Sequence, residues 1–203
     1  MTSIESVTLE VADTAAAERF YNAAFGLGAL VRVQASDAPS SGFRAFTLSL
    51  VVSQPSTVSA LIDSAVEAGA TTLKPVAKSL WGYGGVVQAP DGAIWKVATS
   101  AKKDTRPPTR QVDQVVLLLG ADDVPASKKF YVDHGFTVGK SFGKYVEFAT
   151  PSSPITLALY GRKALAKDAG VSPEGNGFHR LEIGSDAGAF TDPDGFEWVA
   201  VSA

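Results

Sequence analysis

The sequence has no cysteine among its 203 residues. This absence excludes disulfide bonds, thiolate catalysis and cysteine-ligated zinc. No apolar run approaches the ~20 residues that span a bilayer, and the N-terminus lacks the basic and apolar regions of a signal peptide. The net charge is −3 and no basic run is longer than Lys102-Lys103, which argues against a nucleic-acid surface. We therefore expect a cytoplasmic protein with neither a nucleic acid nor a membrane as partner.

One turn motif occurs twice and organises the chain. Pro90-Asp91-Gly92 is followed by Trp95, and Pro193-Asp194-Gly195 is followed by Trp198, 103 residues further on. In both copies the proline presets the turn and the glycine supplies a positive φ. An apolar strand closes each copy, so each motif predicts the end of one half of the chain.

A second pair of motifs recurs in the same order. Asp13 precedes Phe20-Tyr21 by the same interval at which Asp123 precedes Phe130-Tyr131, at an offset of 110 residues. Both aspartates can cap the helix that follows. The second helix ends beside His134, which we expect to cap the terminal carbonyls. Two similar units of about 100 residues therefore follow one another.

Apolar periodicity and turn residues predict the elements of both halves. In the first half we expect strands at 4–11, 30–34, 44–53, 71–76, 85–88 and 94–98, with helices at 14–25 and 57–68. In the second half we expect strands at 112–119, 137–139, 145–149, 155–160, 178–183 and 197–201, with helices at 123–133 and 162–169. Residues 102–111 are charged, contain Pro107-Pro108 and show no periodicity, which is typical of a linker between residues 1–101 and 112–203.

The ordered set of motifs resembles the glyoxalase I / bleomycin-resistance / extradiol-dioxygenase superfamily, also called the vicinal oxygen chelate proteins. The stretch from Val66 through Lys74-Pro75 to Trp81-Gly82 is similar to the middle segment of that family. The resemblance covers nearly the whole chain. It implies an α+β fold of two tandem βαβββ-type modules, both trimmed here, whose mixed sheets curl around a cavity.

Enzymes of this superfamily hold a divalent metal with His, Gln and Glu side chains from first, middle and closing strands. The resemblance places these ligand positions at Ser6, Thr47 and Lys96 in the first module and at Gln114, His179 and Val199 in the second, with a further one near Ala158.

Lys96 and Val199 stand at the closing-strand positions, where a metal enzyme would have a carboxylate. An ammonium group repels a cation, and a valine side chain offers no ligand atom. We therefore expect no metal and no other cofactor. The alternative is a divalent metal near Gln114 and His179, completed by a glutamate that a shift of strand register turns inward.

The repeated tryptophan predicts which residues face the cavity, because side chains alternate along a strand. We expect Trp95 and Trp198 in the core, which turns Lys96 and Val199 toward the cavity. The other residues expected to face the cavity are Ser6, Thr8, Thr47, Gln114, His179 and Leu181.

Three side chains have two interpretations each. His179 is either a hydrogen-bonded histidine at a strand start or a polar anchor or general base in the cavity, tuned by Gln114 and Glu182. In the second case His179 and Glu182 are the candidate catalytic residues. Trp81 and Tyr83 lie in a glycine-rich loop, which in the family borders the cavity, and either bind ligand or pack. Asp91, Asp192 and Asp194 are expected to stabilise their turns rather than to catalyse.

The sequence favours a metal-free protein that binds a small, partly aromatic organic molecule, as in the drug-sequestering branch of the superfamily. A lyase, isomerase or dioxygenase of glyoxalase type is the alternative, and a module without a ligand is a third. Whether the chain is an enzyme is left open, and a homodimer is an option. Metal content separates the first two hypotheses, and ligand titration separates the first from the third.

Overall fold

The computed structural model of the chain describes residues 2–80 and 82–201. The elements of the first half are β1 (Ile4–Val11), α1 (Thr14–Ala24), a 3₁₀ turn (Gly28–Leu30), β2 (Val31–Ala35), β3 (Ser40–Gly42), β4 (Phe46–Val51), α2 (Pro55–Glu67), β5 (Thr71–Ser79), β6 (Gly82–Gln88) and β7 (Ile94–Thr99). Those of the second half are β8 (Gln114–Ala121), α3 (Val124–Asp133), β9 (Thr137–Phe142), β10 (Tyr145–Ala149), β11 (Ile155–Gly161), α4 (Arg162–Ala169), β12 (Gly175–Gly177), β13 (Leu181–Ser185), β14 (Phe190–Thr191) and β15 (Glu197–Ala200).

Two complete βαβββ units lie side by side in the centre of the molecule. In each unit the first and last strands are parallel neighbours: β4 pairs with β7, and β8 pairs with β11. The units meet where β4 and β8 pair antiparallel, with Phe46 opposite Leu119. The resulting central arm has the strand order β5-β6-β7-β4-β8-β11-β10-β9.

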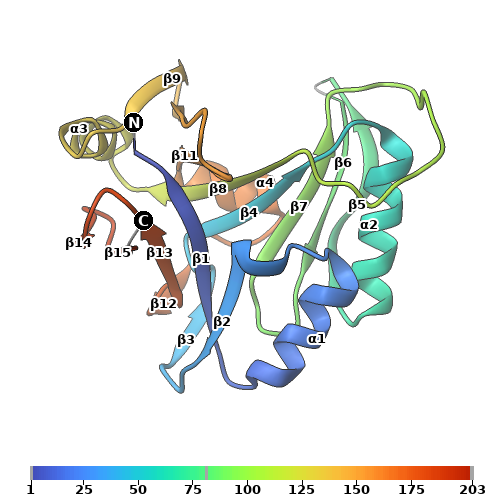
Figure 1. Cartoon of the computed structure of the whole chain (residues 1–203), viewed down its shortest axis with the longest axis horizontal. Coiled ribbons are helices and arrows are strands. Elements are labelled where there is room, and N and C mark those ends of the chain that lie inside the picture. Colours follow the sequence, from blue (N-terminus) through green and yellow to red (C-terminus); the bar gives the residue numbers. More distant parts are fainter. Residues whose placement is uncertain (1, 81, 202–203) are drawn as a thin grey trace.

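A side arm of the same sheet brings the two ends of the chain together (Figure 1). Its order is β2-β1-β13-β15-β14, and β1 of the first half pairs antiparallel with β13 of the second. The pairing of Ile4 with Ile155 joins this arm to β11. Each half of the chain therefore supplies strands to both arms, so the two halves share one sheet. The predicted α+β architecture of two tandem modules with mixed sheets is confirmed.

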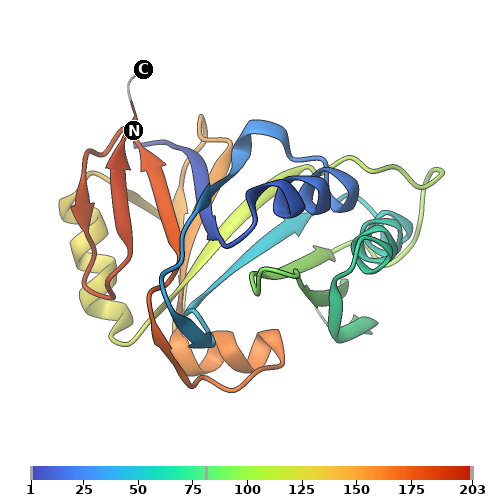
Figure 2. The same ribbon diagram turned by 90° about the horizontal axis from the view of Figure 1, so that it is seen from below.

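Helices cover both faces of the central arm. On one face α1 packs against β7, where the rings of Tyr21 and Trp95 lie 5.4 Å apart, and α2 buries Leu61. On the opposite face α4 contacts β4, β8 and β11, and Figure 2 shows α4 and α1 on opposite sides of these strands. We call the second face the α4 face. It is the face on which the resemblance implies a cavity.

The two predicted repeats carry the same tyrosine–tryptophan contact. Tyr131 of α3 lies 5.5 Å from Trp198 of β15, as Tyr21 lies beside Trp95. Trp95 is 0% and Trp198 is 2% exposed. The prediction that both tryptophans occupy equivalent core positions is therefore confirmed.

Short polar side chains begin and end the helices as expected. The Asp13 carboxylate accepts from the Ala16 amide of α1, at 2.9 Å, and Asp123 accepts from the matching amide of α3. His134 closes α3, with its Nδ1 atom 2.8 Å from the carbonyl oxygen of Phe130. The predicted caps are confirmed at all three positions.

The structure differs from the prediction at two places, the start of β13 and the segment before β4. The strand predicted at 178–183 begins only at Leu181, because Arg180 has a φ of +60° that breaks the extended backbone. Residues 40–42, where the sequence predicts no strand, form β3, which pairs with β12. Local patterns did not reveal these short strands, since each is stabilised by a partner more than 100 residues away.

The predicted linker contains no helix or strand in residues 102–111. It nevertheless lies against the first half, because the Arg110 guanidinium donates to the carbonyls of Ala23 and Ala24 at the end of α1. The module boundaries at 1–101 and 112–203 stay predictions.

Candidate functional site

Lys96 is the charged residue in an otherwise largely apolar closing strand. Its neighbours Trp95 and Val97 are fully buried under α1 and α2, so alternation turns Lys96 to the α4 face. There its Nζ atom lies 2.6 Å from the Oδ2 atom of Asp168 in α4. The predicted orientation of Lys96 is therefore correct, and its partner is a helix of the second half.

Helix α4 runs diagonally across the α4 face. It begins against β8, where a Cβ atom added to Gly120 would lie 3.3 Å from the Cα atom of Arg162. It ends beside β7 and β5, and buries Leu165 and Ala166 on the way. The centre of the face that the resemblance assigns to a ligand is therefore filled by the protein itself.

A second lysine holds the C-terminal end of α4. The Nζ atom of Lys74 in β5 donates to the carbonyl oxygens of Lys167, at 2.8 Å, and of Asp168, at 2.6 Å. Gly170 ends the helix with a φ of +82°, and a Cβ atom there would lie 3.0 Å from the Lys74 side chain. Two ammonium groups thus face the negative end of the α4 dipole.

A pocket of about 320 Å³ remains between this end of α4 and the β5–β6 hairpin. This volume is at the lower end of the range of small-molecule sites. The Lys96 and Asp168 side chains at its wall are 34% and 41% exposed, so solvent screens their ion pair and it contributes only about 0–1 kcal/mol. The residues that line the pocket are Lys74, Pro75, Ala77, Lys78, Ser79, Gly82, Tyr83, Gly84, Gly85, Val86, Lys96, Ala98, Thr99 and Asp168.

Three of the residues predicted to face a cavity, together with the candidate catalytic residue Glu182, lie on the side arm, away from this pocket. Thr8 of β1 is opposite Glu182 of β13, and Ser6 is opposite Gly184. Val199 of β15 is in turn beside Gly184. Ser6, Thr8, Glu182 and Val199 therefore share one face, as alternation requires.

One predicted face was wrong. Leu181 was expected to point the same way as Val199, yet Leu181 is buried in the core and shares the face of Ile183, which is paired with Trp198. The left-handed backbone at Arg180 interrupts the alternation between His179 and β13. Glu182 instead lies on the face that Thr8 and Val199 share.

His179 lies between the two halves of the chain, and both of its ring nitrogens lie near backbone carbonyl oxygens. Its Nδ1 atom is 2.9 Å from the carbonyl oxygen of Arg44, and its Nε2 atom is 2.9 Å from that of Asp194. Its ring stacks on Phe196 at 3.9 Å. Neither nitrogen is directed at an open cavity, so this geometry favours the structural interpretation. The catalytic pairing with Glu182 stays an untested prediction.

Of the remaining predicted residues, Tyr83 lines the pocket beside Lys96, whereas Thr47 and Gln114 do not. Thr47 is buried in β4 on the α4 face. Gln114 begins β8 and donates to the Thr156 hydroxyl at 2.7 Å. The hydroxyl of Tyr83 lies on the α2 side, 3.2 Å from that of Ser59. Trp81 lies outside the described residues.

The described side chains do not fit a metal centre. Gln114 stands at the start of β8. His179 contacts the carbonyl oxygen of Arg44. The next residue, Ala45, accepts a hydrogen bond from the amide of Gly120, near the end of β8. At ~3.3 Å per residue these positions are about 20 Å apart, which is too far for one ion. Within residues 2–80 and 82–201, no three His, Asp or Glu side chains gather to hold a metal.

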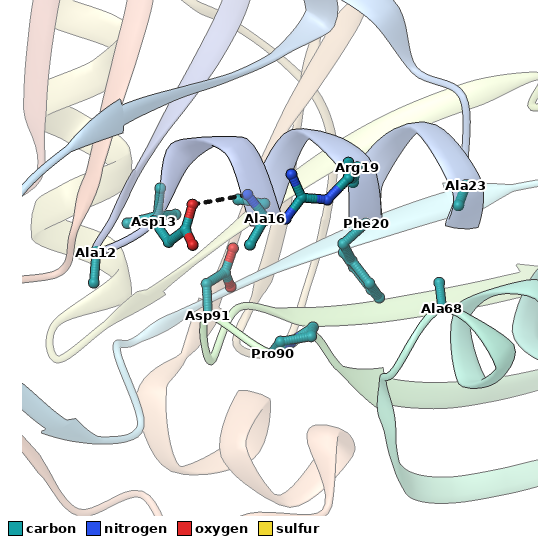
Figure 3. Close-up of a pocket in the computed structure, with 11 residues that line it drawn as sticks. Ala12, Asp13, Ala16, Arg19, Phe20, Ala23, Ala68, Pro90 and Asp91 are labelled. Carbon is teal, nitrogen blue, oxygen red and sulfur yellow. Dashed lines mark hydrogen bonds between the residues drawn. The ribbon is translucent and has the colours of Figure 1, made fainter.

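Two larger grooves each include the start of a helix, α1 in the first half and α3 in the second. One, of about 520 Å³, lies between the start of α1 and the Pro90–Asp91 turn (Figure 3). The other, of about 610 Å³, includes Asp123 and the start of α3. In the first groove Asp13 caps α1 and Asp91 accepts from Tyr21. These carboxylates already serve the fold, so we do not assign the groove as the site.

Two residues of the site were missed in the sequence. Asp168 belongs to a predicted short helix, and nothing in its local pattern shows that this helix reaches Lys96 across the sheet. Lys74 was noted only within the family-like segment. Its place opposite Val86, beside Lys96, follows from strand pairing.

Comparison with known proteins supports the fold. No protein-family model and no curated protein matches the sequence. Glyoxalase I from Zea mays matches the structure with a TM-score of 0.66 and 18% identity, over 100% of this chain and 92% of that chain. A putative dioxygenase from Bacillus subtilis matches with a TM-score of 0.62 and 9% identity, over 98% and 84% of the two chains.

The chain has the fold of glyoxalase I and of this putative dioxygenase. Both matches extend over nearly the whole chain, so they include the pairing of the two halves and not one module alone. This is the fold that the repeated motifs resemble. At such low identity the likeness defines the fold and leaves the ligand to the site itself.

Proposed function

We propose that this protein binds a small organic molecule in the pocket beside Lys96 and does so without the metal centre that the resemblance implies for enzymes of this fold. One observation carries the proposal. The closing strand places an ammonium group, rather than a carboxylate, in a pocket on the face where the resemblance implies the ligand. An ammonium group can bind polar groups of an organic ligand, whereas it repels a cation.

The shape of the pocket is consistent with a compact ligand. Gly82, Gly84 and Ala98 leave its floor free of large side chains, and Val86 adds an apolar surface. A small number of polar groups beside an apolar floor is the usual composition of an organic-ligand site. No feature of the described residues favours the metal-dependent enzyme over this proposal, and that alternative stays a prediction, as does a homodimer.

The proposal is tested by blocking the pocket. Protein purified without chelator is measured for metal content and for co-purified small molecules by native mass spectrometry, and a panel of small organic compounds is screened by thermal shift. Ala98→Phe should abolish any binding, because the new ring fills the pocket. Ala16→Phe is the matched control, since it fills the groove on α1 instead. Binding lost only in Ala16→Phe would refute the assignment of the pocket.

A further inference from the structure

We infer that the ligand of this pocket is a small organic anion, and that the Asp168 carboxylate of α4 competes with it for Lys96. The inference rests on the proposed function, because it requires the pocket to be the ligand site. It adds the chemical class of the ligand and an internal group that the ligand must displace.

The charge of the pocket comes first. Among the described residues that line it, three are lysines and one, Asp168, is acidic. Lys74 and Lys96 both reach the α4 face, as their contacts with α4 show. Without Asp168 the charged groups of the lining would all be cationic. A carboxylate or sulfonate is the ligand group that such a wall attracts.

Asp168 marks the position of the anion. Its Oδ2 atom lies 2.6 Å from the Nζ atom of Lys96, the geometry of a charge-assisted hydrogen bond. Asp168 does not belong to the strands that build the pocket but to α4, which lies across them. The protein thus already presents a carboxylate to the site, from a helix that is not part of the hydrogen-bonded sheet.

The pair is accessible enough to exchange. The exposed fraction of the side chain is 41% for Asp168 and 34% for Lys96. A pair screened in this way is weak, so a carboxylate from solution can replace Asp168. Lys74 stays bound to backbone carbonyls at the helix end, so α4 can keep its anchor while the side chain of Asp168 turns away.

The test uses two probes that differ in charge and share one ring. Binding of 1-naphthoate and of neutral 1-naphthamide is measured by titration calorimetry. The native protein should prefer 1-naphthoate. Asp168→Asn should raise the affinity for 1-naphthoate by up to about fivefold, the factor that corresponds to a weak exposed ion pair, and leave that for 1-naphthamide unchanged. Lys96→Gln should abolish the preference. Asp133→Asn removes the carboxylate of the surface pair with Lys129 and should change neither affinity.

A measurement on the native protein covers the case in which a variant does not fold. Saturating 1-naphthoate should speed amide hydrogen exchange in the last turn of α4, where Asp168 loses its partner, and 1-naphthamide should not. Equal affinities for the two probes, unchanged by Asp168→Asn and Lys96→Gln, would overturn the inference and leave the proposed function intact. If neither probe binds, yet a co-purified molecule is still lost in Ala98→Phe, the inference about an organic anion is likewise overturned and the proposed function stands.

Discussion

The hydroxyl of Tyr131 donates a hydrogen bond of 2.5 Å to the carboxylate of Asp192, in the core between α3 and the closing turn. The first half repeats the arrangement, with Tyr21 donating to Asp91 at 2.6 Å. Each aspartate also accepts from a backbone amide two residues further on. The tyrosine therefore ties the first helix of each half to its last turn.

Tyr131→Phe should lower the free energy of unfolding by about 1.5–3 kcal/mol at pH 7, because a buried carboxylate loses its hydroxyl donor. Tyr21→Phe should act in the same direction. Tyr83→Phe is the control, since its hydroxyl faces only the neutral Ser59 side chain and should cost about 1 kcal/mol or less. Urea denaturation measures the three free energies of unfolding. Equal losses in all three variants would show that the tyrosine–aspartate bonds stabilise the fold no more than the Tyr83–Ser59 contact does.

The same bonds predict a loss of stability at high pH. Burial, reinforced by the charge of the nearby aspartate, raises the pKa of both Tyr21 and Tyr131 well above the ordinary value of 10.0. The unfolded chain ionises first, so this stabilising contribution is complete below pH 10 and is lost as the pH rises toward the folded pKa. Between pH 8 and pH 11 the native protein should lose more stability than the Tyr21→Phe/Tyr131→Phe double variant. Parallel curves would refute this explanation.

Trp95→Ala or Trp198→Ala should destabilise the protein by about 3–5 kcal/mol, because each ring is fully or almost fully buried against a tyrosine. The conservative change Trp95→Phe should cost clearly less, since an aromatic ring still fills part of the space. Chemical denaturation measures both. A loss below about 1 kcal/mol for either alanine variant would show that the ring is not a core residue.

His179→Ala should lower the free energy of unfolding by about 1–3 kcal/mol, because the contact with the Arg44 carbonyl of the first half, the contact with the Asp194 carbonyl and the stacking on Phe196 are lost. The matched change His134→Ala removes a contact within a single helix end and should cost less. If His179→Ala leaves stability unchanged and abolishes turnover of a substrate, the catalytic interpretation is correct.

Divalent metals should not stabilise the protein. Mn²⁺, Ni²⁺, Zn²⁺ and Fe²⁺ should raise the melting temperature no more than a nonspecific salt, since binding to the native state alone raises it through mass action. The physical reason is the lysine at the closing-strand position, together with the wide separation of Gln114 and His179. A saturable shift with one metal, abolished by His179→Ala, would favour the enzyme over the binding protein.

Several features could be predicted because they depend on local chemistry. The caps at Asp13 and Asp123 follow from the side chain that best accepts from a free helix amide. The face of Lys96 follows from its place beside a buried tryptophan in a strand. The repeat follows from matched motifs in matched order. The positive φ at Arg180 has no such signal, and it reversed the predicted face of Leu181.

By itself, the sequence determined the tandem α+β plan, the buried tryptophans and the ammonium group where a metal ligand would stand, because each depends on residue type and short spacing. Only the tertiary structure decided how strands of the two halves pair within the shared sheet, since β1 pairs with β13 and β4 with β8 over long separations. It also decided that α4 crosses the α4 face and brings Asp168 to Lys96, 72 residues away in the chain. The physical reason is that this contact depends on how the helix packs across several strands, and no local pattern specifies such packing.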